Sequence, residues 1–123
     1  GGAISPRTAS ELKCRLVIGG ANHQLEHPDA ASILHARGIL YAPDYVINAG
    51  GVINVAEESE HGGYDRERAL RKVARIYGTL KNIFERSARE NCPTYFVADR
   101  MAEEILAAAE ELKNRQRQAS MRR

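Results

Sequence analysis

Two short apolar runs, each followed by residues that break a strand, constrain the fold of this chain most. The first run, residues 14–18, stops at two glycines, and the second, residues 39–41, stops before Pro43. Between them, residues 29–38 carry apolar side chains at helical spacing and end at a glycine, which is typical of a helix C-terminus. A strand, a helix and a second strand within about 30 residues predict a βαβ unit with parallel strands.

The residues after the second run predict a further strand and then a turn. Residues 45–47 are apolar and are expected to be extended. The small residues Ala49-Gly50-Gly51 are then expected to form a turn that leads into a helix beginning near Val52.

Side chains that can cap a helix mark three further helix starts. Thr8 and Glu11 have the spacing of a capping box, so a short helix is expected from Thr8 to about Leu12. Asp29 is expected to cap the helix that ends at Gly38. Asp65 is expected to cap a long helix that reaches about residue 89.

Two long amphipathic helices are predicted in the second half of the chain, the last one beginning between residues 94 and 99. Their apolar stripes comprise Leu70, Val73, Tyr77, Leu80 and Phe84, and then Met101, Ile105, Leu106, Ala109 and Leu112. A sheet of two or three short strands cannot cover both stripes. The chain is therefore expected to be part of a larger body or of a tight oligomer.

Charge and cysteine content point to no special partner. Lys and Arg outnumber Asp and Glu by 18 to 16, a formal net charge of +2. No apolar run approaches the ~20 residues of a membrane helix, so no membrane partner is expected. Cys14 and Cys92 form no Cys-x-x-Cys motif, and we expect them to be reduced in a cytoplasmic protein.

The C-terminal end is basic and has two interpretations. Residues 113–123 contain no acidic residue and five basic ones, Lys113, Arg115, Arg117, Arg122 and Arg123. Such a run could be a nucleic-acid arm. Because no aromatic residue is interleaved, we favour the solvated end of a helix, where cations complement the helix dipole, and expect no nucleic-acid partner.

Two glycine-led strand ends form the strongest candidate for a binding site. The carboxyl ends of parallel strands face one crevice, so Gly19-Gly20 and Gly50-Gly51 are expected to lie near each other. Asn22 and Asn48 follow the same strands, and their amides can donate to and accept from a carboxamide or ribose hydroxyls. For each asparagine alone, a turn-forming role is the alternative.

Motifs that would carry catalysis do not occur. The sequence has no Gly-x-Ser-x-Gly, no Walker loop and no Gly-x-Gly-x-x-Gly fingerprint. His23 and His27 have a spacing that binds metal on a helix, but Pro28 and the polar neighbours predict a loop there. We therefore expect neither catalytic residues nor a metal site.

Residues 20–25 and 38–57 resemble the Glu/Leu/Phe/Val dehydrogenase superfamily, and the leucine dehydrogenase branch most of all. The resemblance continues through shorter segments at 67–70, 76–78 and 98–104. It implies an α/β fold: a partial Rossmann-type parallel sheet, followed by long C-terminal helices. Residues 1–60 would be the second half of an NAD-binding domain, and residues 61–123 a helical segment packed on it. A homo-oligomer is also implied.

The resemblance also implies roles for individual residues. Those that would line the nicotinamide end of NAD are Ala21, Asn22, Asn48, Gly50 and Gly51. Val52 and Val55 would line an apolar substrate pocket, for which ordinary helix packing is the alternative. The family's catalytic lysine and aspartate and its dinucleotide fingerprint would lie upstream of Gly1, so no catalytic residue is assigned and the chain alone is expected to be inactive.

The implied reaction is NAD-dependent oxidative deamination of leucine, valine or isoleucine to the 2-oxo acid and ammonia. Phenylalanine dehydrogenase is an alternative within the same class. A non-enzymatic nucleotide-binding or interaction module with a basic C-terminus is an alternative from another class. A structural product without activity, stabilised by self-association, is the third.

Overall fold

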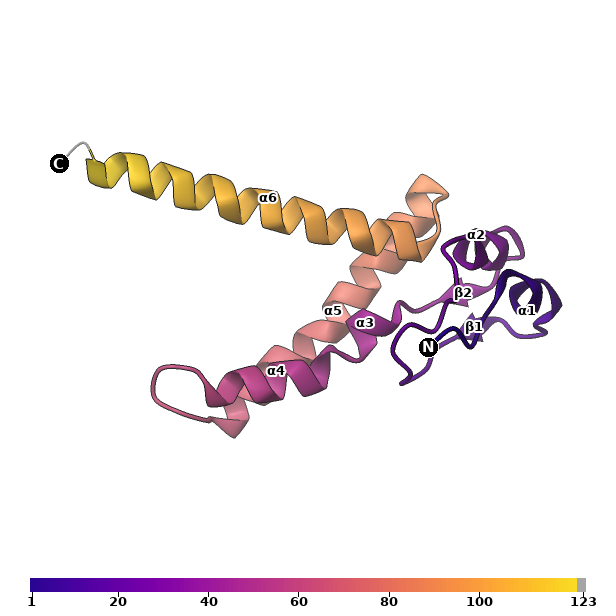
Figure 1. Cartoon of the computed structure of the whole chain (residues 1–123), viewed down its shortest axis with the longest axis horizontal. Helices are drawn as coiled ribbons and strands as arrows, with labels where there is room; N and C mark the ends of the chain where they lie inside the picture. Colours follow the sequence, from indigo (N-terminus) through magenta and orange to yellow (C-terminus); the bar gives the residue numbers. More distant parts are fainter. Residues whose placement is uncertain (122–123) are drawn as a thin grey trace.

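The structure is a computed structural model, and it describes residues 1–121 (Figure 1). In chain order its elements are α1 (Pro6–Glu11), β1 (Leu16–Val17), α2 (Asp29–Ala36), β2 (Leu40–Tyr41), α3 (Asp44–Ile47), α4 (Ala49–Glu58), α5 (Arg66–Glu90) and α6 (Thr94–Met121). The described chain is thus mostly helical, with a small parallel sheet near its N-terminal end.

The predicted βαβ unit is present, with shorter strands than expected. β1 pairs in parallel with β2, with Leu16 opposite Leu40 and Val17 opposite Tyr41. An isolated parallel bridge between Ile4 and Leu25 adds one more pairing. The helices α1 and α2 pack together beside this sheet, and a cluster of buried apolar residues joins them to it: Ala9, Ala30, Leu34, Ile39 and Tyr41.

The expectation of a third strand at residues 45–47 is wrong, because these residues form α3. Pro43 has a φ of −56° and precedes the helix. The acidic Asp44 lies in the first turn, where its negative charge interacts favourably with the helix dipole. Asn48 is also helical in backbone conformation, so α4 follows at once and begins at Ala49 rather than near Val52. The two glycines at 50 and 51 therefore lie within the first turn of α4 and not in a turn before it.

Of the three predicted helix caps, only the one at Asp65 is present in the structure. α1 begins at Pro6, and the hydroxyl of Ser5, not that of Thr8, accepts the capping hydrogen bond, from the Thr8 N–H at 3.1 Å. Asp29 is the first residue of α2 and makes no cap. Asp65 does cap α5, as predicted, and accepts from the Arg68 N–H at 3.0 Å. The predicted glycine stop after α2 is also present, since Gly38 has a φ of +68°.

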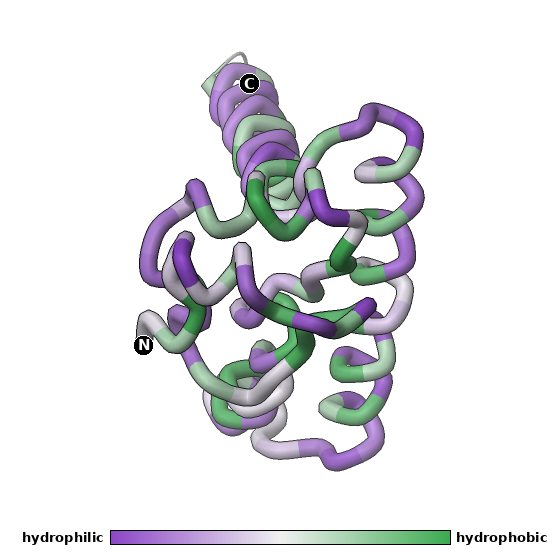
Figure 2. Tube along the Cα trace, turned by 90° about the vertical axis from the view of Figure 1, so that its right-hand side faces the viewer, coloured by the Kyte–Doolittle hydropathy of each residue, from purple (hydrophilic) through white to green (hydrophobic). Residues whose placement is uncertain are grey.

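The long helices α5 and α6 meet near the break at residues 91–93, and α6 then projects from the rest of the molecule (Figure 1). Ile83, Val97 and Ala98 form the buried contact between them. Beyond residue 101 every described residue of α6 is exposed, and along both helices hydrophobic and hydrophilic residues alternate (Figure 2). The apolar stripes are therefore only partly buried. Their exposed large members are Leu70, Tyr77, Ile105, Leu106 and Leu112.

Candidate functional site

The structure brings together the two asparagines that the sequence singles out. Asn48 Nδ2 donates to Asn22 Oδ1 at 3.2 Å, although the two residues are 26 positions apart. Asn22 lies in the loop after β1, and Asn48 joins α3 to α4. Asn48 occupies the position before α4 without capping it, because its side chain is turned towards Asn22 instead. Ala21 is exposed beside this pair. Two amides with free hydrogen-bonding capacity thus lie at the start of α4.

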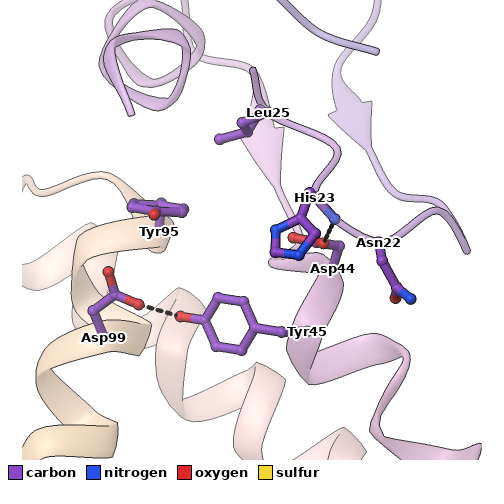
Figure 3. Close-up of a pocket in the computed structure, with 7 residues that line it drawn as sticks. All are labelled: Asn22, His23, Leu25, Asp44, Tyr45, Tyr95 and Asp99. Atoms are coloured by element: carbon purple, nitrogen blue, oxygen red, sulfur yellow. Dashed lines mark hydrogen bonds between the residues drawn. The ribbon is translucent and has the colours of Figure 1, made fainter. Parts of the chain in front are cut away.

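A buried carboxylate joins the two segments that carry these amides. Asp44 is 7% exposed, and its Oδ2 accepts the backbone N–H of His23 at 2.6 Å, as Figure 3 shows. Its Oδ1 accepts from the Tyr41 hydroxyl at 2.8 Å. Burial, together with the Asp44 hydrogen bond, raises the pKa of Tyr41 well above its ordinary value. The loop after β1 is therefore attached to the start of α3 by a short, partly buried hydrogen bond.

Gly50 and Gly51 are not required by the fold of the described residues. Neither has a positive φ, and a Cβ built on either one would meet nothing within 4 Å. Glycine in a helix is nevertheless unfavourable by roughly 1 kcal/mol relative to alanine. Gly19 differs, because a Cβ there would lie 2.6 Å from Nε2 of the buried Gln24. The glycine pair of α4 thus leaves open a surface next to the asparagine pair.

Val52 and Val55 follow on α4 and are 72% and 64% exposed. Spaced three residues apart, they lie on neighbouring positions of one helix face. Both valines are thus largely exposed among the described residues. They extend the exposed surface that begins at the glycine pair.

Beside the asparagine pair lies an open cavity of about 480 Å³ that the sequence did not predict. It is lined by Asn22, His23, Leu25, Asp44, Tyr45, Tyr95 and Asp99 (Figure 3). The Tyr45 hydroxyl donates to Asp99 Oδ1 at 2.8 Å. The pKa of Tyr45 is raised above its ordinary value, mainly by partial burial and secondly by this hydrogen bond. Asn22 lies at the edge of this cavity, and its amide points away from Tyr45, Tyr95 and Asp99 (Figure 3).

The orientation of α4 is fixed by a second buried carboxylate. Glu57 has no exposed surface and contacts the Arg68 guanidinium through Oε1 and the Lys72 ammonium through Oε2. The Lys72 contact, at 2.7 Å, is an ion pair rather than a well-directed hydrogen bond. Lys72 and then Arg68 hold the pKa of Glu57 below its ordinary value, although burial acts in the opposite direction.

The sequence interpretation missed Asp44 and Glu57. Pro43-Asp44 has the pattern of a helix start, and this is the sequence signal that predicts α3 and its acidic first residue. No pattern in the sequence marks Glu57 as buried, because its two cationic partners come from another helix.

Metal and membrane sites are not found in the part of the chain that the structure describes. Within residues 1–121, no three His, Cys, Asp or Glu side chains gather closely enough to hold a metal ion. Over the same residues, no helix combines the length and the apolar character needed to cross a bilayer.

Comparison with known proteins identifies the family. The model of the glutamate/leucine/phenylalanine/valine dehydrogenase family matches residues 1–118. The chain belongs to this family. It is 52% identical over 104 residues to leucine dehydrogenase from Geobacillus stearothermophilus, an alignment that covers 85% of this chain and 28% of the relative. It is 48% identical over 109 residues to valine dehydrogenase from Streptomyces albus, covering 89% of this chain and 29% of the relative.

A solved structure of an amino acid dehydrogenase is similar to this chain in its mixed α/β fold. The crystal structure of L-tryptophan dehydrogenase from Nostoc punctiforme superposes with a TM-score of 0.82 and 41% sequence identity. The superposition covers 90% of this chain and 34% of the solved one. The chain thus spans about a third or less of the family members that it matches, and the resemblance inferred from the sequence is confirmed over nearly all of its own length.

Proposed function

We propose that this chain is the nicotinamide-binding portion of an NAD-dependent amino acid dehydrogenase that deaminates leucine, valine or isoleucine oxidatively. Residues 1–60 would form the second half of the NAD-binding domain, and residues 61–123 would pack on it; Arg122 and Arg123 lie outside the described residues. The observation that carries the proposal is the hydrogen-bonded pair Asn22–Asn48 beside two helical glycines that the fold does not need.

The chemistry of this surface fits a nicotinamide ring and its ribose. Asn48 donates one amide hydrogen to Asn22 Oδ1, which leaves its second amide hydrogen and its own carbonyl oxygen, together with the amide hydrogens of Asn22, to bond a carboxamide or ribose hydroxyls. At Gly50 and Gly51 a flat ring can approach the helix backbone closely, because no side chain intervenes. Ala21 adds a small side chain at the same edge. When bound, NAD would supply the hydride acceptor of the reaction.

The substrate side of the proposal depends on Val52 and Val55. Val52 directly follows the glycines and Val55 lies one turn further along α4, so their exposed methyl groups could cover an aliphatic side chain next to the nicotinamide. Relatives of this chain are described as leucine and valine dehydrogenases, which favours a branched aliphatic substrate. Phenylalanine remains the alternative substrate. We assign no acid–base group to this chain, since Lys72 is engaged by Glu57 and Glu60.

A chimera tests this function directly. The matched 104 residues would replace the corresponding segment of the Geobacillus stearothermophilus leucine dehydrogenase, and NADH formation would be measured with leucine, valine, isoleucine, phenylalanine and tryptophan. We expect leucine turnover within about tenfold of the parent enzyme. A chimera that folds but turns over none of these amino acids would refute the proposal, and a preference for phenylalanine would favour the alternative.

The isolated chain provides the matched control. We expect the purified 123-residue chain to show no leucine turnover and only weak binding of NAD. The proposal also includes a cytoplasmic location and a homo-oligomer, for which the exposed apolar residues of α5 and α6 provide candidate contact surface. Gel filtration of the active chimera, compared with its parent, tests whether this segment supports the parent's assembly.

A further inference from the structure

The hydrogen bond between Asn22 and Asn48 is too weak to fix the relative position of the two segments that carry these residues. It is a single exposed hydrogen bond of 3.2 Å between neutral amides, and water can replace either partner. The two residues belong to separate segments, the loop after β1 and the link between α3 and α4. Some other interaction must keep these segments in register if the two amides are to present one surface to a ligand.

Asp44 makes a short, partly buried hydrogen bond between those segments. Its Oδ2 accepts from the N–H of His23, the residue directly after Asn22, at 2.6 Å. On the other side, Asp44 opens the four-residue helix α3, and the N–H of Asn48 donates to the Asp44 carbonyl at 2.8 Å. One residue thus contacts the neighbour of Asn22 through its side chain and Asn48 through its backbone.

The conformation of the loop is consistent with such an anchor. His23 has a φ of 54°, in the left-handed region that residues other than glycine adopt infrequently, although histidine does so more often than most. The loop is held from the other side by the N–H of Gly2, which donates to the His23 carbonyl at 2.5 Å. The His23 peptide group is therefore fixed on both sides, and Asp44 is the partner that relates it to α3.

Asp44 is itself held rigidly. The Tyr41 hydroxyl donates to its other oxygen at 2.8 Å, and both side chains are buried. Tyr41 belongs to β2, and its carbonyl accepts from the Thr94 hydroxyl of α6 at 2.6 Å. The carboxylate consequently has a fixed position relative to the sheet and to α6.

We propose that Asp44 is a positioning residue for the nicotinamide: its hydrogen bond to the His23 N–H holds Asn22 against Asn48 as one recognition surface. This inference rests on the proposed function. It assigns to Asp44 no contact with the ligand and no part in proton transfer.

Titration of the 123-residue chain with nicotinamide mononucleotide, followed by NMR of the backbone and asparagine side-chain amides, tests this role. Asp44→Ala removes the acceptor. Asp44→Asn keeps an oxygen that can accept from His23. Asp65→Ala is the matched control, because it also removes a carboxylate that accepts a backbone N–H, at 3.0 Å, but at the start of α5. Adenosine monophosphate serves as the ligand control.

In wild-type chain the Asn22 and Asn48 side-chain amides should shift with nicotinamide mononucleotide and not with adenosine monophosphate. Asp44→Ala should weaken binding at least tenfold, whereas Asp44→Asn and Asp65→Ala should stay within about threefold of wild type. Binding by a folded Asp44→Ala chain within twofold of wild type overturns the positioning role alone, as does a loss in Asp44→Asn equal to that in Asp44→Ala. No shift in wild-type chain overturns the proposed function and the positioning role together.

A measurement on the unmodified chain decides the matter if Asp44→Ala does not fold. Ligand that binds across the asparagine pair should stabilise the loop that Asp44 holds, so exchange of the His23 amide hydrogen should slow at least fivefold at saturating nicotinamide mononucleotide. An unchanged exchange rate under saturation would show that the Asp44–His23 bond is not coupled to the site and would overturn the proposal.

Discussion

Glu57 Oε2 in α4 lies 2.7 Å from Lys72 Nζ in α5, and no part of the Glu57 side chain is exposed. The Arg68 guanidinium, one turn before Lys72, contacts the other oxygen of the same carboxylate. The helix that carries the glycine pair and the two valines is therefore attached to α5 by charge as well as by packing. Removing one member of a buried group of opposite charges is strongly destabilising, because the remaining charges lose their compensation.

Replacing Glu57 by glutamine is expected to destabilise the chain markedly. The neutral amide would leave the cations of Arg68 and Lys72 without their buried partner, and we expect the melting temperature to fall on the order of 10 °C. Circular dichroism melts measure this directly. Glu60→Gln is the matched control, because Glu60 also pairs with Lys72, at 2.8 Å, but its side chain is half exposed. Equal effects of the two substitutions would contradict the central role of Glu57.

Stability is also expected to fall in acid. The pKa values of Glu57, Glu90 and Glu104 are lowered, first by Lys72 for Glu57 and first by Arg86 for the other two. Carboxylates with lowered folded-state pKa values stabilise the fold above their ordinary value of about 4.5, and that contribution is lost as the pH falls through the lowered pKa. Melting temperatures measured from pH 7 to pH 3 should drop below about pH 4.5. The drop should be smaller in Glu57→Gln, and a flat profile would contradict the assignment.

Substitutions at Val52 and Val55 should separate substrate binding from stability. Threonine has nearly the volume of valine but adds a hydroxyl, which is costly to bury against an aliphatic substrate without a partner. Since both valines are more than 60% exposed, the melting temperature of each threonine variant should change by no more than about 2 °C. In the chimera, KM for leucine should rise about tenfold while KM for NAD stays constant. A proportional rise in both KM values would argue against a substrate-side role.

The sequence predicts correctly two features that depend only on neighbouring residues, a helix cap and a helix end. The glycine stop at Gly38 and the cap at Asp65 were predicted correctly, because backbone conformation and capping depend on residues within a turn. Residues 45–47 were assigned wrongly as a strand, because a short apolar run is ambiguous and no pairing partner exists for it in the described residues. Here the tertiary environment, together with Pro43, determined the helix.

The sequence predicts the asparagine pair of the site but not the two carboxylates, Asp44 and Glu57, that hold its segments in place. The sequence places Asn22 near Asn48 correctly, but the reason it offers is wrong, because Asn48 follows the helix α3 and not a parallel strand. The bond from Asp44 to His23 could not be predicted, since it requires a left-handed φ at His23 that nothing in the sequence demands. Likewise, the burial of Glu57 depends on how α4 lies on α5, which is a property of the packed pair and not of either helix.

Replacing the glycines of α4 should make the chain more stable and abolish ligand binding. A Cβ at Gly50 or Gly51 meets nothing in the described structure, and alanine favours a helix by up to about 1 kcal/mol over glycine, so the melting temperature should rise by about 3 to 5 °C. The same methyl group would occupy the surface that we assign to the nicotinamide, so NMR shifts with nicotinamide mononucleotide should disappear. Gly78→Ala provides the matched control: Gly78 lies within α5, its Cβ position is equally open, and alanine there should raise stability without changing binding. Undiminished binding in both Gly50→Ala and Gly51→Ala would show that the glycine pair does not face the ligand.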